Sequence, residues 1–208
     1  MIPSTFTYAN AAISTEANIF QAIHLPERNI VIYQRDIEPL RRELAQMEEQ
    51  AIEFRGTGSS PEILSQLSAY LNPLVSGHSS LLDDVAGLLR LFEQTTQVAS
   101  FRLLLATVST NMCRKFHTDV NDVRLLCTYV GPGTLWIPDE ALDQRAAARD
   151  EPQIDPALIQ QAGTGEAVLL KGALYPGGQP ILHRSPTIEE QGEQRLLLRI
   201  DTNASLSL

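Results

Sequence analysis

Cysteine, aromatic residues and basic charge are all scarce in this chain of 208 residues. Its two cysteines cannot build a disulfide framework and form no CxxC pair, which excludes a redox or zinc motif of that kind. The 16 lysines and arginines are outnumbered by 25 aspartates and glutamates, so the net charge is −9. Such an acidic chain cannot neutralise a run of phosphates, which argues against nucleic acid or an anionic membrane as a general partner.

Long apolar runs are absent as well. A stretch such as 168–170 (VLL) is far shorter than the roughly 20 residues of a membrane-spanning helix. The first lysine or arginine is Arg28, and the residues before it lack the apolar block of roughly 7–15 residues that marks a secretory signal. We therefore expect a cytoplasmic protein without a membrane partner. Hydrophobic residues make up 43% of the chain and charged residues 20%, which is typical of a folded globular domain.

The first half of the chain is typical of helices. Apolar residues recur at helical spacing over 37–50 and over 80–98, and Ser60-Pro61 predicts the start of a helix near 61–71. The segment 29–33 (NIVIY) predicts a short strand. We expect residues 1–99 to form a mainly helical support region. The apolar stripe over 80–98 is expected to pack on a sheet, and it is also compatible with a homodimer face.

From Ser100 the pattern changes to short runs rich in Val, Thr, Tyr and Leu, separated by Asn, Gly and Pro, which is typical of strands. The predicted strands are 101–109, 112–117, 123–130, 134–137, 166–171, 180–184 and 195–201. Residues 138–162 are predicted to form a loop with a short helix near 156–161. The fold class is therefore α+β, with an antiparallel sandwich or barrel over 100–208 supported by the N-terminal helices.

One histidine differs from the other three because a carboxylate follows it at a spacing of two. On a strand, His117 and Asp119 would share a face and could bind one metal ion. His183 ends a later predicted strand, and Arg195 begins the next one. Two imidazoles and one carboxylate suit non-haem Fe(II) that activates dioxygen. An arginine on a neighbouring strand could hold a carboxylate through two charge-assisted hydrogen bonds.

The residue types leave alternatives open. The same three ligands also suit zinc, so they do not decide the metal. Cys113 shares strand parity with His117 and could point toward the site, although burial as a small apolar residue is the commoner role of a free cysteine. Four basic residues flank the proposed site in the sequence and could attract an anionic substrate. They are Arg114, Lys115, Lys171 and Arg184.

Several segments together resemble a known family. They are 117–119 (HTD), 124–129 (RLLCTY), 131–138 (GPGTLWIP), 168–172 (VLLKG), 183–186 (HRSP) and 195–201 (RLLLRID). Over about residues 100–202 they resemble a bacterial family catalogued as domain of unknown function 1826. Their order also resembles the double-stranded β-helix, a jelly-roll or cupin-like fold, of Fe(II)- and 2-oxoglutarate-dependent dioxygenases, particularly the prolyl-4-hydroxylase branch.

This resemblance implies roles for particular residues. His117, Asp119 and His183 would bind Fe(II), and Arg195 would bind the distal carboxylate of 2-oxoglutarate, with Tyr129 as a second hydrogen-bond donor. The chain departs from the dioxygenase pattern at Leu197, where a serine or threonine often follows two positions after the basic residue.

Three functions follow from these observations. The first is an Fe(II)- and 2-oxoglutarate-dependent oxygenase whose substrate, a small molecule or a protein, is unknown. The second is a non-catalytic metal-binding protein that handles or senses zinc through the same residues. The third is a scaffold whose helical half binds a partner.

Overall fold

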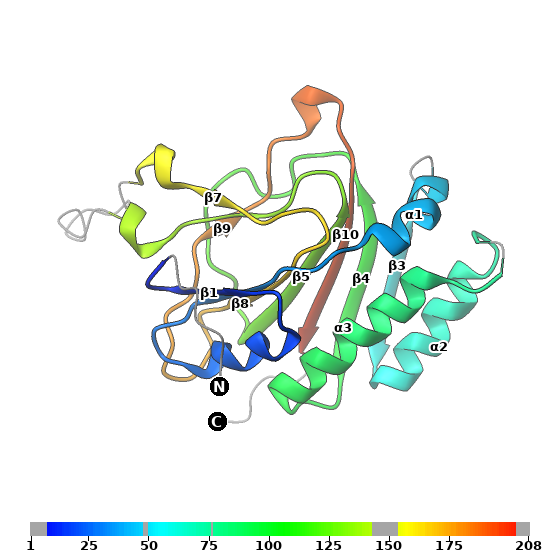
Figure 1. Cartoon of the computed structure of the whole chain (residues 1–208), viewed down its shortest axis with the longest axis horizontal. Helices are drawn as coiled ribbons and strands as arrows, with labels where there is room; N and C mark the ends of the chain where they lie inside the picture. The colour runs from blue at the N-terminus through cyan, green and yellow to red at the C-terminus, as the bar shows by residue number, and fades with distance from the viewer. Residues whose placement is uncertain (1–7, 48–49, 76, 143–153, 203–208) are drawn as a thin grey trace.

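Figure 1 shows a computed structural model of the chain, in which two β-sheets face each other and helices cover one of them. The structure describes residues 8–47, 50–75, 77–142 and 154–202. The major sheet has seven strands in the order β1-β2-β8-β5-β10-β4-β3, and the minor sheet has three in the order β7-β6-β9.

The elements have the following bounds. The strands of the major sheet are β1 (Ala11–Ser14), β2 (Ile30–Tyr33), β3 (Glu53–Gly58), β4 (Phe101–Val108), β5 (Val123–Val130), β8 (Ala167–Lys171) and β10 (Arg195–Thr202). Those of the minor sheet are β6 (Leu135–Trp136), β7 (Gln160–Gln161) and β9 (His183–Arg184). The α-helices are α1 (Arg41–Met47), α2 (Ser60–Leu71) and α3 (Ser80–Thr96). Short 3-10 helices are η1 (Ala17–His24), η2 (Glu38–Leu40), η3 (Asp139–Ala141), η5 (Pro156–Leu158) and η6 (Glu189–Gln191).

From β4 onward the chain winds alternately between the two sheets. It leaves β4 in the major sheet, makes an isolated bridge from His117 to the minor sheet, and returns to the major sheet in β5. Strands β6 and β7 lie in the minor sheet, β8 in the major, β9 in the minor and β10 in the major. This winding is that of a double-stranded β-helix, which confirms the predicted fold class.

The strand predictions are confirmed closely where side chains alternate between two buried environments. The strands β5 and β10 match the predicted 123–130 and 195–201 almost residue for residue. The predicted strand 112–117 is wrong, because only His117 makes a bridge there. The side chain of Asn111 instead accepts hydrogen bonds from the backbone N–H groups of Ile188 and Glu189, which holds this segment as a loop.

The N-terminal half differs from the predicted helical support region, because it also contributes three strands to the major sheet. Strand β2 was predicted, whereas β1 and β3 were not. Strand β3 pairs with β4 at one edge of the major sheet, and β1 pairs in parallel with β2 at the other. The described part of residues 1–99 therefore extends the same sheet at both ends instead of supporting it only from outside.

The helices cover the outer face of the major sheet, on the near side in Figure 1. Leu81, Val85, Leu88 and Phe92 of α3 are buried in the core that this face forms with the helices. The predicted apolar stripe therefore packs on the sheet and is not available as a dimer face. A second cluster, which includes Trp136, lies between the two sheets. We call the side of the major sheet that faces the minor sheet its inner face.

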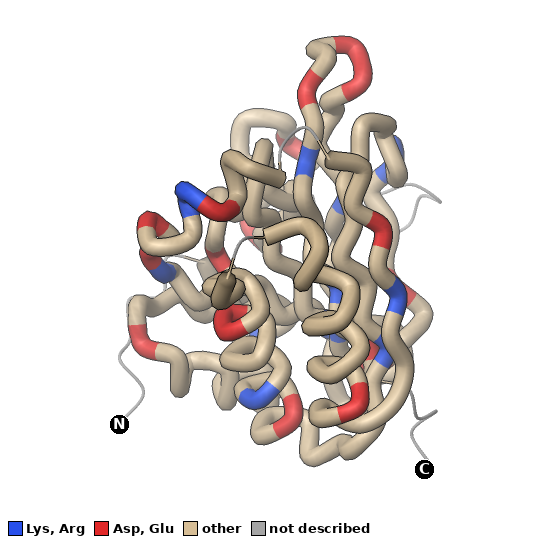
Figure 2. Tube along the Cα trace, turned by 90° about the vertical axis from the view of Figure 1, so that its right-hand side faces the viewer, with Lys and Arg blue, Asp and Glu red and all other residues tan. Residues whose placement is uncertain are grey.

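Charge is distributed unevenly over the surface. The loop between β9 and β10 projects from the top of the molecule and carries Glu189, Glu190 and Glu193, so its tip is acidic (Figure 2). None of the helices in the described ranges combines the length and the hydropathy that a membrane crossing would need.

Candidate metal centre

The backbone brings the two predicted metal-binding histidines side by side. His117 and His183 form an antiparallel bridge in which each N–H donates to the carbonyl of the other, both at 3.0 Å. On its other side His183 pairs with Trp136 of β6. The two imidazole centroids are 4.6 Å apart, although the residues are far apart in the sequence.

Asp119 completes the group. Its Oδ1 lies 3.7 Å from Nε2 of His117, and its Oδ2 lies 3.4 Å from Nε2 of His183. One ligand atom from each of the three residues lies within 4.8 Å of the others. The structure thus brings together all three of the residues that the sequence singled out as metal ligands. Cys113, the open alternative, is not part of this group.

The hydrogen bonds around the group prepare it for a cation. The Nδ1 atoms of His117 and His183 lie 3.2 Å from the backbone carbonyls of Lys115 and Ile181 respectively. A proton on each Nδ1 satisfies that carbonyl and leaves the Nε2 lone pair free for a metal. Asp119 Oδ2 is buried without a hydrogen-bond donor. These residues therefore fit a divalent metal ion, which would satisfy the buried oxygen.

Electrostatic contacts set the protonation states that metal binding needs. Burial lowers the pKa of His183, although Asp119 opposes the effect, so its imidazole is neutral near neutral pH. Arg124 Nη1 lies 2.6 Å from Asp119 Oδ1, and Arg124 Nε lies 2.6 Å from Asp201 Oδ1. Burial opposes charge on Arg124, but its pairing with Asp201 and Asp119 raises its pKa. Arg124 thus holds the carboxylate of Asp119 in place beside the two imidazoles.

Arg195 is a buried cation without an acidic partner. Its exposed fraction is 1%, its Nη2 donates to Thr128 Oγ1 at 2.9 Å, and its Nε is buried without an acceptor. Burial lowers the pKa of Arg195 to about 10. Within the described residues, no carboxylate makes an ion pair with it. A buried guanidinium is costly unless an anion neutralises it, so this position fits a carboxylate from a bound molecule.

Thr128 is a site residue that the sequence reasoning missed. It pairs with Leu197 across β5 and β10, and both side chains lie on the inner face. The dioxygenase pattern often has a serine or threonine at the position of Leu197, whereas here the hydroxyl beside Arg195 belongs to Thr128. The period-two alternation of 124, 126 and 128 in β5 was the signal that could have found it.

Trp136 adds a second unpaired donor near this interior. It is 2% exposed and faces the space between the sheets, as does His183, its neighbour across the strand pair. Its Nε1 is buried without an acceptor. Buried indole N–H groups usually find a partner, so Trp136 also fits a polar ligand in this space.

Tyr129 does not lie where the resemblance implied. Its side chain belongs to the core on the outer face, opposite to Thr128, because neighbouring residues of a strand point to opposite sides. Its hydroxyl donates to Asp84 Oδ2 at 2.6 Å. Asp84 also receives two hydrogen bonds from Arg35. Asp84 of α3 therefore holds both Tyr129 of β5 and Arg35 after β2, and the expectation that Tyr129 would contact a cosubstrate beside Arg195 is corrected.

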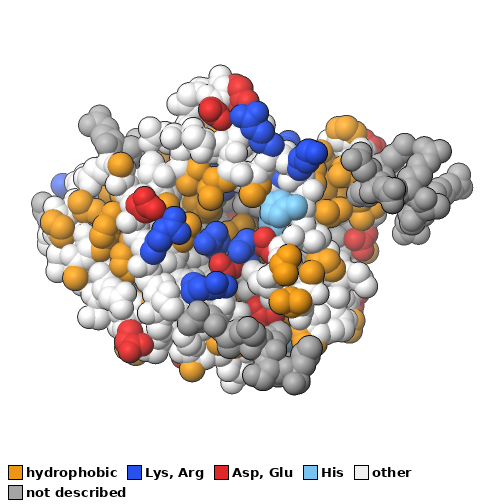
Figure 3. Space-filling view, turned by 180° about the vertical axis from the view of Figure 1, so that it is seen from behind, with side chains coloured by type: hydrophobic (Ala, Val, Ile, Leu, Met, Phe, Trp, Pro, Cys, Tyr) orange, Lys and Arg blue, Asp and Glu red, His pale blue; other side chains and the backbone are white. Residues whose placement is uncertain are grey.

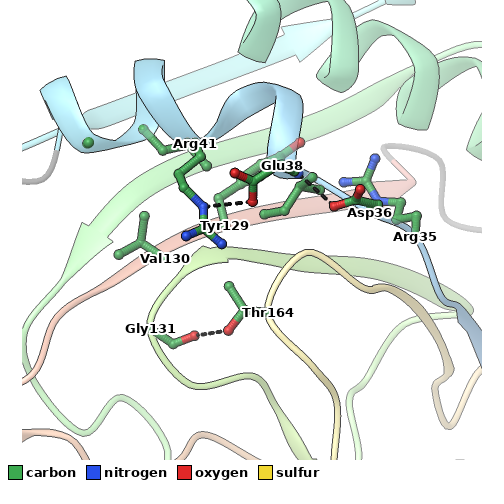
Figure 4. A pocket seen from close by; sticks show the side chains of 11 residues that line it. Arg35, Asp36, Glu38, Arg41, Tyr129, Val130, Gly131 and Thr164 are labelled. Atoms are coloured by element: carbon green, nitrogen blue, oxygen red, sulfur yellow. Dashed lines mark hydrogen bonds and ion pairs between the residues drawn. The ribbon is translucent and has the colours of Figure 1, made fainter.

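A cavity of about 520 Å³ opens beside this cluster, on the outer side of the major sheet (Figure 4). Its polar groups are satisfied within the protein: Arg41 pairs with Glu38, and Thr164 donates to the carbonyl of Gly131. The major sheet separates this cavity from the three metal-binding candidates. It therefore offers no unpaired group that would suggest a ligand.

The basic residues singled out from the sequence are placed differently from one another. Lys171 is buried, donates to the carbonyl of Leu25 and stacks on Tyr175, so it cannot attract a substrate. Arg114 pairs with Glu189 at the protein surface.

The sequence matches the model of the family described as "protein of unknown function (DUF1826)" over residues 14–201. The chain belongs to this family. The DUF1826 match extends the predicted resemblance from the C-terminal half to nearly the whole chain. No curated protein gives a significant sequence match.

Solved structures similar to this DUF1826 protein include a BsmA homologue from Methylobium petroleophilum, with 12% identity, a TM-score of 0.50, and coverage of 91% of this chain and 93% of that one. They also include the dioxygenase for auxin oxidation 1 from Arabidopsis thaliana with 2-oxoglutarate, with 10% identity, a TM-score of 0.47, and coverage of 100% and 94%. A Pseudomonas putida prolyl-4-hydroxylase has 11% identity, a TM-score of 0.44, and coverage of 89% and 92%. At such identities the likeness concerns the fold.

Proposed function

We propose that this protein is an Fe(II)- and 2-oxoglutarate-dependent oxygenase. The observation that carries the proposal is the unpaired Arg195 guanidinium, buried on the inner face of the same two-sheet core that presents His117, Asp119 and His183. Three protein ligands leave positions on the metal for a bidentate 2-oxo acid and for dioxygen. Bound Fe(II) would supply the redox chemistry, and 2-oxoglutarate would supply the further electrons that dioxygen reduction requires.

The protein's own residues would bind the metal ion, orient the cosubstrate and exclude water from the site. The two imidazoles present Nε2 because their Nδ1 atoms are held on backbone carbonyls. Arg124 orients the carboxylate of Asp119, and Arg195 with Thr128 offers charge-assisted hydrogen bonds to the far carboxylate of the cosubstrate. The apolar residues between the sheets exclude water from this interior.

The zinc-handling alternative explains less of the structure. The three ligands alone would suffice for zinc, but a zinc carrier gives no reason for a buried, unpaired arginine. Thr128 also places a hydroxyl beside Arg195, although Leu197 departs from the dioxygenase pattern.

Anaerobic addition of Fe(II) and then 2-oxoglutarate tests the proposal. The wild-type chain should develop the visible charge-transfer band of the chelate. His183→Ala should lose metal binding, and Arg195→Met should retain the metal but bind 2-oxoglutarate about 100-fold more weakly, since about 3 kcal/mol of charged hydrogen bonding is lost. Arg90→Gln, an exposed change on α3, serves as the control. A folded wild-type chain that binds metal without forming the band would contradict the proposal, as would an unchanged 2-oxoglutarate affinity in Arg195→Met.

A further inference from the structure

The minor sheet covers only part of the inner face of the major sheet. On the side of the major sheet, the buried cluster between the sheets contains residues of β1, β2, β8 and β5. Its only residue from β10 is Leu197. The inner faces of β4 and β3, together with the rest of β10, remain outside that cluster. Figure 3, which views the molecule from behind, shows this region as a surface on which basic side chains gather beside a histidine.

Strand register identifies these basic residues. Phe101 and Leu103 point into the outer core, so Arg102 between them points to the inner face. In the strand register, Arg102 of β4 lies opposite Asp201 of β10, and Asp201 lies opposite Arg124 of β5. The three residues therefore form one row across these strands. In the next row, Leu104 lies between Arg55 on β3 and Arg199 on β10. We call Arg55, Arg102 and Arg199 the arginine platform.

The carboxylates nearby neutralise this surface only in part, because among the described residues none of them forms an ion pair with Arg102. Asp119 and Asp201 are both engaged by Arg124, and Asp201 also lies 3.2 Å from Nε of Arg199. Glu53 pairs with Arg55 at the exposed edge of the sheet. Burial lowers the pKa of Arg199, and the positive charges of Arg124 and Arg55 act in the same direction, against the attraction of Asp201. The platform is therefore a cationic surface on a chain whose net charge is −9.

The platform is also continuous with the metal centre. Arg124 contacts Asp119, one of the three candidate ligands, and Arg102 lies two strands away in the same row, at about 10 Å by ordinary strand spacing. A divalent ion at Asp119 would add further positive charge at this end of the row. A small molecule held on the platform would thus lie close to the candidate metal centre.

We propose that the arginine platform binds a phosphate group of the substrate. Arg102 has no ion pair among the described residues, and the guanidinium groups of Arg55 and Arg199 lie on the same face and can share their remaining N–H donors with the oxygen pairs of a phosphate monoester. This inference rests on the proposed oxygenase function, which it deepens by assigning a phosphorylated small molecule as the substrate class.

Inorganic phosphate is a suitable probe, measured by phosphorus NMR on the full chain after metal removal, so that phosphate cannot bind a metal ion. Arg102→Gln should weaken phosphate binding about tenfold, which corresponds to about 1.4 kcal/mol, and Arg199→Gln should have a smaller effect because Asp201 already pairs with Arg199. Arg55→Gln should have a smaller effect because Glu53 already pairs with Arg55. The matched control Arg90→Gln lies on α3 and should leave the affinity unchanged.

Three results would overturn the inference: no phosphate binding by the wild-type chain, equal weakening by Arg90→Gln, or acetate binding as tightly as phosphate. Arg102 is exposed, so its variant is expected to fold even if Arg199→Gln does not. The charge-transfer band measured on Arg102→Gln separates the two proposals. An intact band with weakened phosphate binding supports the platform, and an intact band with unchanged phosphate binding removes the platform while leaving the oxygenase proposal standing. Arg102-dependent phosphate binding by a chain that never forms the band would support the anion site and contradict the oxygenase.

Discussion

At the scale of single residues, two largely buried arginines differ in whether the protein supplies an anion to neutralise them. Arg35 is neutralised by Asp84 at 2.5 Å, whereas Arg195 has only the hydroxyl of Thr128. Both are largely buried arginines on strand or strand-adjacent backbone, so burial alone does not distinguish a structural residue from a ligand-binding one. The distinguishing property is whether the protein itself supplies the anion.

The two cysteines provide a test of residue-scale environment. Burial raises the pKa of Cys127 from the usual 9.0 to about 11, although Arg35 opposes the effect, whereas Cys113 is half-buried. A thiol-specific reagent at about pH 8 should modify Cys113 quickly and Cys127 only when the chain unfolds, because the thiolate is the reactive form. Cys113→Ser should remove the fast phase.

The raised pKa of Cys127 also makes the free energy of unfolding depend on pH in a defined direction. The folded chain keeps the Cys127 proton up to about pH 11, whereas the unfolded chain loses it near the ordinary value of 9.0. Cys127 therefore lowers the free energy of unfolding as the pH rises between these values, and not at neutral pH. Rapid modification of both cysteines in folded protein would contradict the buried environment of Cys127.

At the scale of elements, the first turn of α3 depends on a residue of α1. Glu43 accepts hydrogen bonds from the backbone N–H groups of Ser80 and Leu81 at 2.7 and 3.2 Å, and from the hydroxyl of Ser79. Ser79 in turn accepts from the N–H of Leu82. A carboxylate at a helix N-terminus satisfies free donors and interacts favourably with the helix dipole.

Replacing Glu43 should therefore destabilise the packing of α3. We expect Glu43→Ala to lower the free energy of unfolding by about 1–2 kcal/mol, measured by urea denaturation. Glu38→Ala is the matched control, because Glu38 forms an exposed ion pair with Arg41 that should contribute less than about 1 kcal/mol. Equal effects of the two substitutions would show that the Glu43 contacts do not stabilise α3.

At the scale of the whole molecule, the metal centre joins segments that are otherwise far apart. The loop after β4 provides His117 and Asp119, and β9 provides His183. A ligand that binds the folded chain alone stabilises it by mass action. Metal binding should thus be coupled to global unfolding.

Thermal unfolding measures this coupling. With Mn(II) at about 100 times its Kd, the folded state should gain about 2.7 kcal/mol. For a domain of this size we expect the Tm to rise by roughly 5–10 °C. A chelator should reverse the increase, and His183→Ala should abolish it. A Tm that does not respond to any divalent ion would contradict the metal centre.

The sequence by itself determined most strands of the C-terminal half, although not 112–117, and the residue types of the candidate metal centre. Short runs rich in Val, Thr, Tyr and Leu predicted β5 and β10, and the spacing of His117 and Asp119 indicated metal-binding chemistry. These signals are local, because strand periodicity and ligand type are properties of neighbouring residues.

Only the tertiary structure decided which groups meet. The bridge between His117 and His183, the pairing of Thr128 with Arg195, and the placement of Tyr129 on the outer face all depend on which strands are adjacent and in what register. The same holds for the arginine platform, whose residues come from β3, β4 and β10. A shift of one residue in the register would move every side chain of a strand to the opposite face. The sequence of a single strand does not specify which strand lies next to it.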